Sequence, residues 1–599
     1  MTKELPERSE VPVEDTWDLT TIFATDEQWE EEYNSLNKEI PKINSFQGTL
    51  GDSAEQLYDL FQFQDKISER LGKLYTYAHM RYDQDTTNST YQAMNQKAES
   101  VLTAASSNMS FIVPEILQID EETINGFLTE HKGLQLYQKT LDEIARQRAH
   151  ILSEKEEVLL SEASEALQTP AQTFGMLNNA DLTFPKIKDE NGNEVELTHG
   201  RYIHFLESQD RSVREGAFKA MHQTFGDFKN TFAATLTGNV KKDNFNAKVR
   251  HYQSARHAAL NGNKIPETVY DNLIDAVHEK LPVFHRYIDL RKKVLDVDEL
   301  HMYDLYTPLV QDGKMTVDYE QAKKYVLESL APLGEEYQGI VQKAFNHRWI
   351  DVVENKGKRS GAYSSGTYGT NPFILMNWQN NINNLYTLTH ELGHSVHSYY
   401  TTTHQPFRYG NYSIFVAEVA STCNEALLSE YLLHHLGDEK QRLSILNHFL
   451  EGFRGTVFRQ TMFAEFEHAI HVKEQNGEPL TADIFTEIYY DLNKKYFGTN
   501  IHIDEEIGME WARIPHFYYN YYVYQYATGY AAATSLAHQI LTEKDVAVER
   551  YKNFLKAGSS DFPIDVLKKA GVDMTSKAPV LEALNVFEEK LNEFEALIK

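Results

Sequence analysis

Apolar residues recur along most of this chain with the 3.6-residue period of an amphipathic helix. Such a segment buries one face and leaves the other in water. Ser153, three residues before Glu156, forms a capping-box pattern that marks one helix start. Proline, which interrupts helices, occurs only 16 times. The segments predicted to be helical are 53–80, 84–112, 134–150, 153–168, 211–234, 266–295, 319–345, 440–475 and 578–598.

Strand signals are few. Residues 181–198 read as a hairpin whose turn lies at Asn191 and Gly192. A second strand is predicted from Pro372 to Trp378, after a loop rich in Gly, Ser and Tyr at 361–370. We expect this strand to form the edge of a small sheet beside the next helix, where a peptide could add as an extra strand. A buried strand with no binding role is the alternative.

These elements predict a mainly α fold, a large two-lobed helical body with a small β-sheet. The 599 residues suffice for an extensive core and for more than one domain. We expect an N-terminal helical lobe over 1–195 and a second region over 196–599. No Ser/Pro-rich linker marks the boundary, which could shift by tens of residues.

The chain is strongly acidic, with a formal net charge of −30. Such a chain repels phosphate backbones and anionic membrane surfaces, so nucleic acid and membrane are poor partners. Cys423 is the only cysteine, which excludes an intramolecular disulfide and a Cys-based zinc cluster. The N-terminus lacks the pattern of a secretory signal, and no apolar run is long enough to span a bilayer. We therefore expect a cytoplasmic protein.

The first candidate for chemistry is the run His390-Glu391-Leu392-Gly393-His394. On a helix, His390 and His394 lie one turn apart on one face, where both imidazoles can bind one Zn²⁺ beside the intervening Glu391. The apolar residues of this segment cluster on the opposite face. These residues are Leu385, Leu388, Leu392, Val396 and Tyr399. The alternative is a helix with solvent-exposed histidines.

A zinc site of this type needs a third protein ligand and leaves the fourth position for water. In the predicted helix 415–433, Glu418, Ser421, Thr422 and Glu425 share one polar face. A carboxylate on an otherwise apolar helix is costly to bury unless it meets a cation. We expect Glu418 to be the third ligand and Glu425 to accept a proton from a ligating His. The exchange of these two roles stays open, as does a surface position for Glu425.

Together these residues resemble the thimet oligopeptidase and oligoendopeptidase F family of zinc metallopeptidases. The resemblance is carried by the zinc motif and by Glu418–Ser421, and is strongest over 200–580. Three further stretches contribute: Phe373–Trp378, Phe415–Thr422 and His516–Gly529. The resemblance implies a helical body with zinc on the floor of a deep channel. It also implies cleavage of short peptides in mid-chain and exclusion of folded proteins.

The same resemblance gives a role to the Tyr-rich segment 516–530. In the family, a His and tyrosines of such a segment stabilise the oxyanion formed from the scissile carbonyl. By order of residues, His516, Tyr522 and Tyr530 are the matches, and Tyr519 or Tyr521 are alternatives because the alignment needs gaps. Several tyrosines of this segment must instead pack in the core.

The expected reaction is metal-assisted peptide hydrolysis with Glu391 as the general base. It needs one Zn²⁺ per chain and no covalent intermediate, so Cys423 is not a nucleophile. The expected partners are short peptides, and the oligomeric state is unknown. The runner-up is a zinc carboxypeptidase or dipeptidase on a similar helical scaffold. A non-catalytic scaffold with a vestigial site is the rival from another class.

Overall fold

The computed structural model describes residues 4–310 and 315–598, and it confirms the mainly α fold. The chain divides into two compact units that are interleaved along the sequence. The first unit comprises Met1–Ala149, Lys314–Leu432 and Leu536–Gly571, and the second comprises His150–Gly313, Leu433–Ser535 and Val572–Lys599. The division at residue 195 and the deep channel stay predictions.

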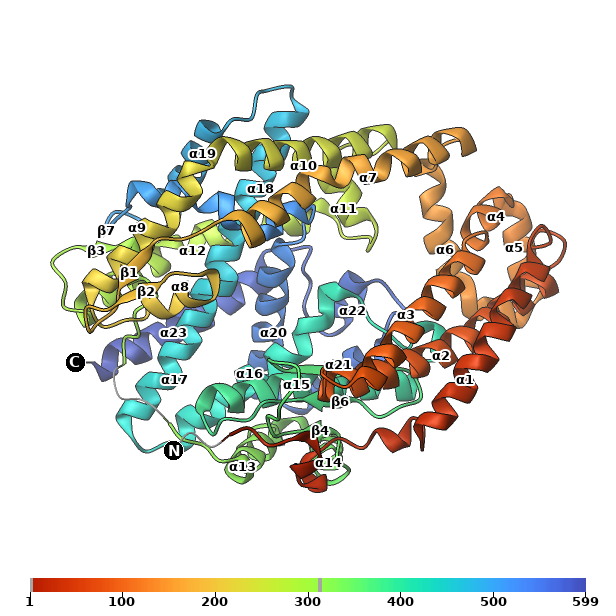
Figure 1. The fold of residues 1–599 in the computed structure, drawn as a ribbon, viewed down its shortest axis with the longest axis horizontal. Coiled ribbons are helices and arrows are strands. Elements are labelled where there is room, and N and C mark those ends of the chain that lie inside the picture. The colour runs from red at the N-terminus through yellow and green to blue at the C-terminus, as the bar shows by residue number, and fades with distance from the viewer. Residues whose placement is uncertain (1–3, 311–314, 599) are drawn as a thin grey trace. The chain divides into compact units, whose positions relative to one another are not determined.

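The first unit combines helices with a small sheet (Figure 1). The N-terminal helices α1 to α3 pack onto one another, and their core includes Phe373 and Leu375 of strand β6. The helices are α1 Asp26–Glu39, α2 Ala54–Gln84, α3 Ser89–Met109, α4 Ile112–Gln118, α5 Glu121–Glu130, α6 Gln138–Gln147, α13 Tyr319–Ser329, α14 Glu335–Asn346, α15 Ile382–His404, α16 Ile414–His435, α21 Asp545–Ala557 and α22 Pro563–Lys569.

The sheet of the first unit corrects one expectation. Its order is β4 (Ile350–Asp351), β6 (Phe373–Leu375), β5 (Tyr363–Ser365). The predicted strand is therefore β6, which is central and buried, so no peptide can add to it. It pairs parallel to β4 and antiparallel to β5. Strand β5 is instead an edge strand of this sheet, and it is half-buried and contacts α15. The sequence gives β5 no apolar run, since it lies in the polar loop 361–370.

The second unit contains the other long helices and two two-stranded sheets. The predicted hairpin is confirmed as β1 (Lys186–Lys188) and β2 (Glu194–Glu196), with Gly192 at φ +78° in its turn. The short strands β3 (Leu300–His301) and β7 (Ile501–His502) pair in parallel. The helices are α7 Glu154–Met176, α8 His199–Leu206, α9 Arg211–Asp227, α10 Lys229–Val249, α11 Ala255–Asn261, α12 Glu267–Val294, α17 Glu439–Gly452, α18 Arg459–Gln475, α19 Ala482–Phe497 and α23 Ala578–Leu597. Helix α20 (Tyr524–Glu543) begins in this unit and ends in the first.

Most predicted helices are observed, but three are interrupted. The segment 319–345 breaks at Leu330–Gly334, where Gly334 has φ +86°. The segment 211–234 becomes α9 and α10, separated at Phe228. The segment 440–475 contains a π-helical stretch at Phe453–Phe458 between α17 and α18. In each case the apolar period continues through the break, so periodicity alone does not show it.

Among the described residues, the helices include none that is long and apolar enough to cross a membrane.

Candidate metal centre and catalytic residues

Helices α15 and α16 carry the candidate metal ligands and lie side by side (Figure 1). Asn381 caps α15 by accepting the main-chain N–H of Asn384. The predicted apolar face is buried at Leu385, Leu388, Leu392 and Val396, and Tyr399 is only partly buried.

The close approach of these helices depends on Gly393. A Cβ atom at this position would lie 2.5 Å from Ser421 Cα of α16 and 2.8 Å from the Ala420 carbonyl oxygen. Only glycine leaves room for that backbone. Because Gly393 lies between the two histidines, the contact brings α16 to the helix face next to them.

Three ligand atoms meet where α15 faces α16. The Nε2 atoms of His390 and His394 are 3.1 Å apart. Glu418 Oε2 lies 3.2 Å from His390 Nε2 and 3.3 Å from His394 Nε2. Tetrahedral ligands at zinc-ligand distances of about 2.0–2.1 Å are separated by about 3.3 Å. The donor set and its spacing therefore fit one zinc ion, with a fourth position left for water.

Glu425 occupies a different place from Glu418. Its Oε1 lies 2.5 Å from His390 Nδ1, on the far side of the imidazole from the other two donors. A proton on Nδ1 that is shared with this carboxylate leaves the Nε2 lone pair free for a metal. Burial disfavours the charged form of His390, but the Glu418 and Glu425 carboxylates outweigh it and raise the pKa of His390 to about 10. Hydrogen bonds from His390 and His394 lower the pKa of Glu418.

Glu391 is buried beside the same three donors. Burial raises the pKa of its carboxyl group, and the neighbouring His390 and His394 oppose that rise. The main chain of Ser364, on the edge strand β5, lies near enough to the Glu391 carboxylate to lower its pKa. Ser364 Oγ also lies 2.8 Å from Ser395 Oγ on α15. The strand is thus fixed next to the residue that sequence reasoning selects as the base.

His397 does not join the metal cluster, although it follows His394 by three residues. Its ring is buried and stacks on Tyr412, with ring centroids 3.8 Å apart. Cys423, on α16, is also buried. Burial raises the pKa of the Cys423 thiol to about 12. Such a thiol is protonated at neutral pH and is a poor nucleophile.

A second group of possible ligands, His301, His502 and Asp504, lies in the second unit. Here both carboxylate oxygens are already engaged. Asp504 Oδ1 lies 2.8 Å from His301 Nδ1, and Oδ2 accepts the main-chain N–H of Met302 at 2.9 Å. Asp504 therefore links the ends of β3 and β7 by hydrogen bonds. Glu418 differs, because it faces two Nε2 atoms.

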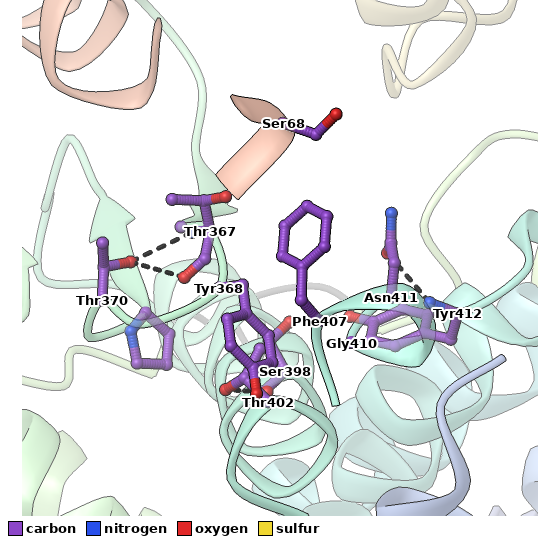
Figure 2. A pocket seen from close by; sticks show the side chains of 12 residues that line it. Ser68, Thr367, Tyr368, Thr370, Ser398, Thr402, Phe407, Gly410, Asn411 and Tyr412 are labelled. Carbon is purple, nitrogen blue, oxygen red and sulfur yellow. Dashed lines mark hydrogen bonds between the residues drawn. The ribbon is translucent and has the colours of Figure 1, made fainter. Parts of the chain in front are cut away.

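A cavity of about 250 Å³ continues along the same face of α15, within the first unit. Its wall includes Ser398 and Thr402, which follow His394 at four-residue intervals, and Tyr412, which precedes α16. Figure 2 shows Ser398 and Thr402 on this helix, with Tyr368 and Phe407 beside them. The described residues that line the cavity carry no charge.

The Tyr-rich segment lies in the second unit and divides into two sets of side chains. Phe517, Tyr521 and Tyr524 are buried and form the inner set. The outer set is at least partly exposed, and we call it the His516 cluster. It consists of His516, Tyr519, Tyr522 and Tyr526.

Contacts within the His516 cluster are direct. Tyr526 Oη lies 3.3 Å from His516 Nε2. The rings of Tyr522 and Tyr526 have centroids 5.5 Å apart, and the His516 and Tyr522 rings are stacked with centroids 6.5 Å apart. Burial lowers the pKa of His516, which keeps the imidazole neutral at pH 7. Neutral imidazole N–H and phenol O–H groups are suitable hydrogen-bond donors to an oxyanion.

Tyr530, the third predicted residue of this segment, lies elsewhere in the second unit. Its ring packs edge-to-face on Phe453, with centroids 5.0 Å apart, and its hydroxyl is close to Gly452. Tyr526, which was not among the predicted residues, lies beside His516. Tyr522, Tyr526 and Tyr530 follow one another at four-residue intervals. This spacing places all three on one helix face, so it does not show which of them lies beside His516.

The turn inside the segment is strained. Asn520 and Tyr521 have φ of +35° and +55°, the left-handed region that residues with a Cβ rarely adopt. Each such residue costs on the order of 1–3 kcal/mol. Two members of the His516 cluster precede this turn and two follow it, so the turn sets their relative positions.

Comparisons with known proteins show which families and structures the chain resembles. The family model "Peptidase family M3" matches residues 204–586, and "Oligopeptidase F" matches 115–184. The chain is 63% identical to oligopeptidase PepF of Bacillus subtilis, over 99% of this chain and 89% of that protein. It is 51% identical to the group B oligopeptidase PepB of Streptococcus agalactiae, over 99% and 98%. The crystal structure of oligoendopeptidase-F from Enterococcus faecium superposes with a TM-score of 0.74 at 44% identity, covering 96% of this chain and 99% of that one.

Proposed function

Because the chain belongs to peptidase family M3, in which it resembles the oligopeptidase F proteins, we propose that it is a zinc endopeptidase that cleaves internal bonds of short oligopeptides. His390, His394 and Glu418 hold the metal in this proposal, and Glu425 orients His390. The single observation that carries it is the set of three ligand atoms spaced 3.1–3.3 Å from one another. That spacing leaves a tetrahedral site with one open position.

Glu391 is the general base of the proposed reaction. A bound zinc ion lowers the pKa of a water molecule toward neutrality and polarises the peptide carbonyl. The Glu391 carboxylate accepts the proton of the attacking water and returns it to the leaving amine. Its buried position and raised pKa support this role, because a carboxylate in water is a weaker base.

The His516 cluster supplies the donors that stabilise the oxyanion in this proposal. This part follows the family resemblance, and the contacts within the cluster support it for His516, Tyr522 and Tyr526. Removal of one such donor costs about 100–1,000-fold in kcat in other hydrolases. Tyr530 remains the sequence-based candidate, but its packing on Phe453 favours Tyr526 instead.

Two features of the first unit support a peptide as the substrate. Strand β5 is the sheet edge whose Ser364 contacts Glu391, so a peptide paired with β5 runs beside the base. The uncharged cavity lined by Ser398 and Thr402 lies one to two turns beyond His394 and takes an uncharged substrate side chain. Cytoplasmic location stays a prediction from sequence.

A panel of quenched fluorescent peptides tests the function. Peptides blocked at both ends should be cleaved in mid-chain by the protein with one zinc bound per chain, as shown by product masses. Cleavage confined to peptides with a free C-terminus would instead identify the carboxypeptidase. Chelation should abolish turnover and zinc should restore it. Hydrolysis by the metal-free protein would refute the metal centre.

A further inference from the structure

A buried carboxylate behind the Tyr-rich segment has no place in the proposed chemistry. Glu467, on α18, is fully buried. Its Oε1 accepts the main-chain N–H of Tyr521 at 2.7 Å, and its Oε2 has no hydrogen-bond partner among the described residues. A buried carboxylate with one unsatisfied oxygen destabilises the fold, so stability alone does not explain it. Glu467, Tyr521 and the His516 cluster all lie in the second unit.

The N–H donor of this hydrogen bond, Tyr521, belongs to the strained turn. Tyr521 is in the left-handed region, as is Asn520 before it. The N···O distance of 2.7 Å is shorter than the usual 2.9–3.0 Å. His516 and Tyr519 lie before this turn and Tyr522 and Tyr526 lie after it, so the conformation of the turn determines whether the two halves of the cluster face one another.

Residues around Glu467 also contact the Tyr521 side chain. His471, one turn along α18, packs against the Tyr521 ring at a tilt of 49°, with centroids 4.8 Å apart. His471 Nε2 lies 3.5 Å from Asp243 Oδ2 of α10, and Tyr521 Oη lies 3.0 Å from His468 Nδ1. The Tyr521 side chain is therefore fixed by α18 on the same side as its main chain. Burial raises the pKa of Glu467 to about 7, and carboxyl groups perturbed in this way are concentrated at functional sites.

We propose that Glu467 is a positioning residue for peptide hydrolysis. It holds the strained Asn520–Tyr521 turn through the Tyr521 N–H and thereby aligns the two halves of the His516 cluster. It touches neither substrate nor metal. The inference rests on the proposed role of the His516 cluster, and it adds a residue on α18 that acts through this turn.

Three substitutions separate the hydrogen bond from charge and size. Glu467→Gln keeps an acceptor at the same reach, so kcat should stay within about threefold of the wild type. Glu467→Asp keeps the charge but withdraws the acceptor, and Glu467→Leu removes it. Both should lower kcat by about 100-fold, the effect of misplacing catalytic groups by about 1 Å, with KM changed less than threefold. Glu465→Gln is the matched control, because Glu465 is on the same helix but pairs with His278 and Lys495.

A double-mutant cycle shows whether Glu467 acts through the cluster. In a Tyr522→Phe/Tyr526→Phe background, Glu467→Leu should add little to the loss already present, because both donors that follow the turn are gone. Zinc content and far-UV circular dichroism should match the wild type in every variant. A Glu467→Leu protein with wild-type kcat would overturn the proposal. The proposal would also be overturned if the loss in kcat from Glu467→Leu were as large in the tyrosine-substituted background as in the wild type.

Hydrogen exchange keeps the two proposals distinguishable. The Tyr521 amide should exchange slowly in the wild type and in Glu467→Gln, and at least 100-fold faster in Glu467→Leu. Unchanged protection in Glu467→Leu overturns the positioning role even if that variant fails to turn over. If His516→Ala and Tyr522→Phe both keep full activity, the oxyanion role of the cluster is wrong. In that case, faster exchange of the Tyr521 amide in Glu467→Leu would show only that Glu467 stabilises the turn. The proposed contribution of Glu467 to catalysis would then be wrong.

Discussion

Substitution of Gly393 by alanine tests whether the spacing between α15 and α16 creates the metal site. The added Cβ would lie 2.5 Å from Ser421 Cα, whereas carbon atoms in contact are about 3.5–4.0 Å apart. The two backbones must therefore separate by about 1 Å. Glu418 lies on α16 one turn before Ser421 and moves with it. Metal–ligand distances tolerate only about 0.2 Å.

The expected result is a loss of zinc affinity in a protein that still folds. Overpacking costs about 1–3 kcal/mol, and alanine recovers about 1 kcal/mol because it is a better helix former than glycine. The free energy of unfolding of the metal-free protein should thus fall by no more than about 2 kcal/mol. Zinc affinity should fall at least 10–100-fold, as it does when less direct contacts to ligands are lost in other zinc enzymes.

The assay is a zinc competition titration of the metal-free protein against a chromophoric chelator, with urea unfolding in parallel. Gly126→Ala is the matched control, because a Cβ at Gly126 in α5 meets nothing within 4 Å. That variant should gain up to about 1 kcal/mol of stability and bind zinc normally. Wild-type zinc affinity in Gly393→Ala would refute the reasoning, since it would mean that Glu418 does not depend on the close helix contact.

Three further predictions concern other residues. Glu391→Gln should retain one zinc per chain and lose about 100–10,000-fold in kcat, measured with metal analysis on the same sample; activity within tenfold of the wild type would remove Glu391 from the base role. Thr402→Phe should fill part of the cavity beside α15 and lower kcat/KM at least tenfold for peptides with bulky uncharged side chains, while peptides with small ones are spared; an equal loss for both would argue against a side-chain site. Burial lowers the pKa of His222 to about 4, so the unfolded chain binds a proton below pH 6.5 that the folded chain does not, and stability falls as pH decreases. Between pH 7.5 and pH 5 the wild type should lose about 2 kcal/mol more than His222→Phe in urea unfolding, and equal losses would contradict this account.

The sequence predicts most helices well, and it predicts which residues of α15 share a face, because both depend on local spacing. His390 and His394 share a helix face at any tertiary arrangement, and the apolar stripe of α15 identifies the side that is buried. The position of β6 within its sheet was predicted wrongly, because strand order depends on pairing with β4 and β5, which are only two and three residues long. Short strands leave little periodicity to read.

The Tyr-rich segment shows a second limit of sequence reasoning. Tyrosines occupy seven of the fifteen positions 516–530, so spacing alone does not separate Tyr526 from Tyr530. Which of the two tyrosines faces His516 depends on the left-handed turn at Asn520–Tyr521, because the turn sets the orientation of α20 relative to His516. Neither residue is glycine, and although asparagine adopts this conformation more readily than most residues, nothing in the sequence predicts it for Tyr521. Glu467, which accepts the Tyr521 N–H and in our proposal holds this turn, lies more than fifty residues earlier in the chain.

The buried position of Cys423 has a practical consequence for spectroscopy. Since the single native thiol is sequestered and protonated, maleimide and methanethiosulfonate reagents should leave the native protein unlabelled. A pair of cysteines introduced on the surface, one in each compact unit, would then be the sole attachment points for fluorophores or spin labels. Interprobe distances, recorded with and without a peptide inhibitor, could be measured on a chain whose interior had not been altered to remove a background thiol.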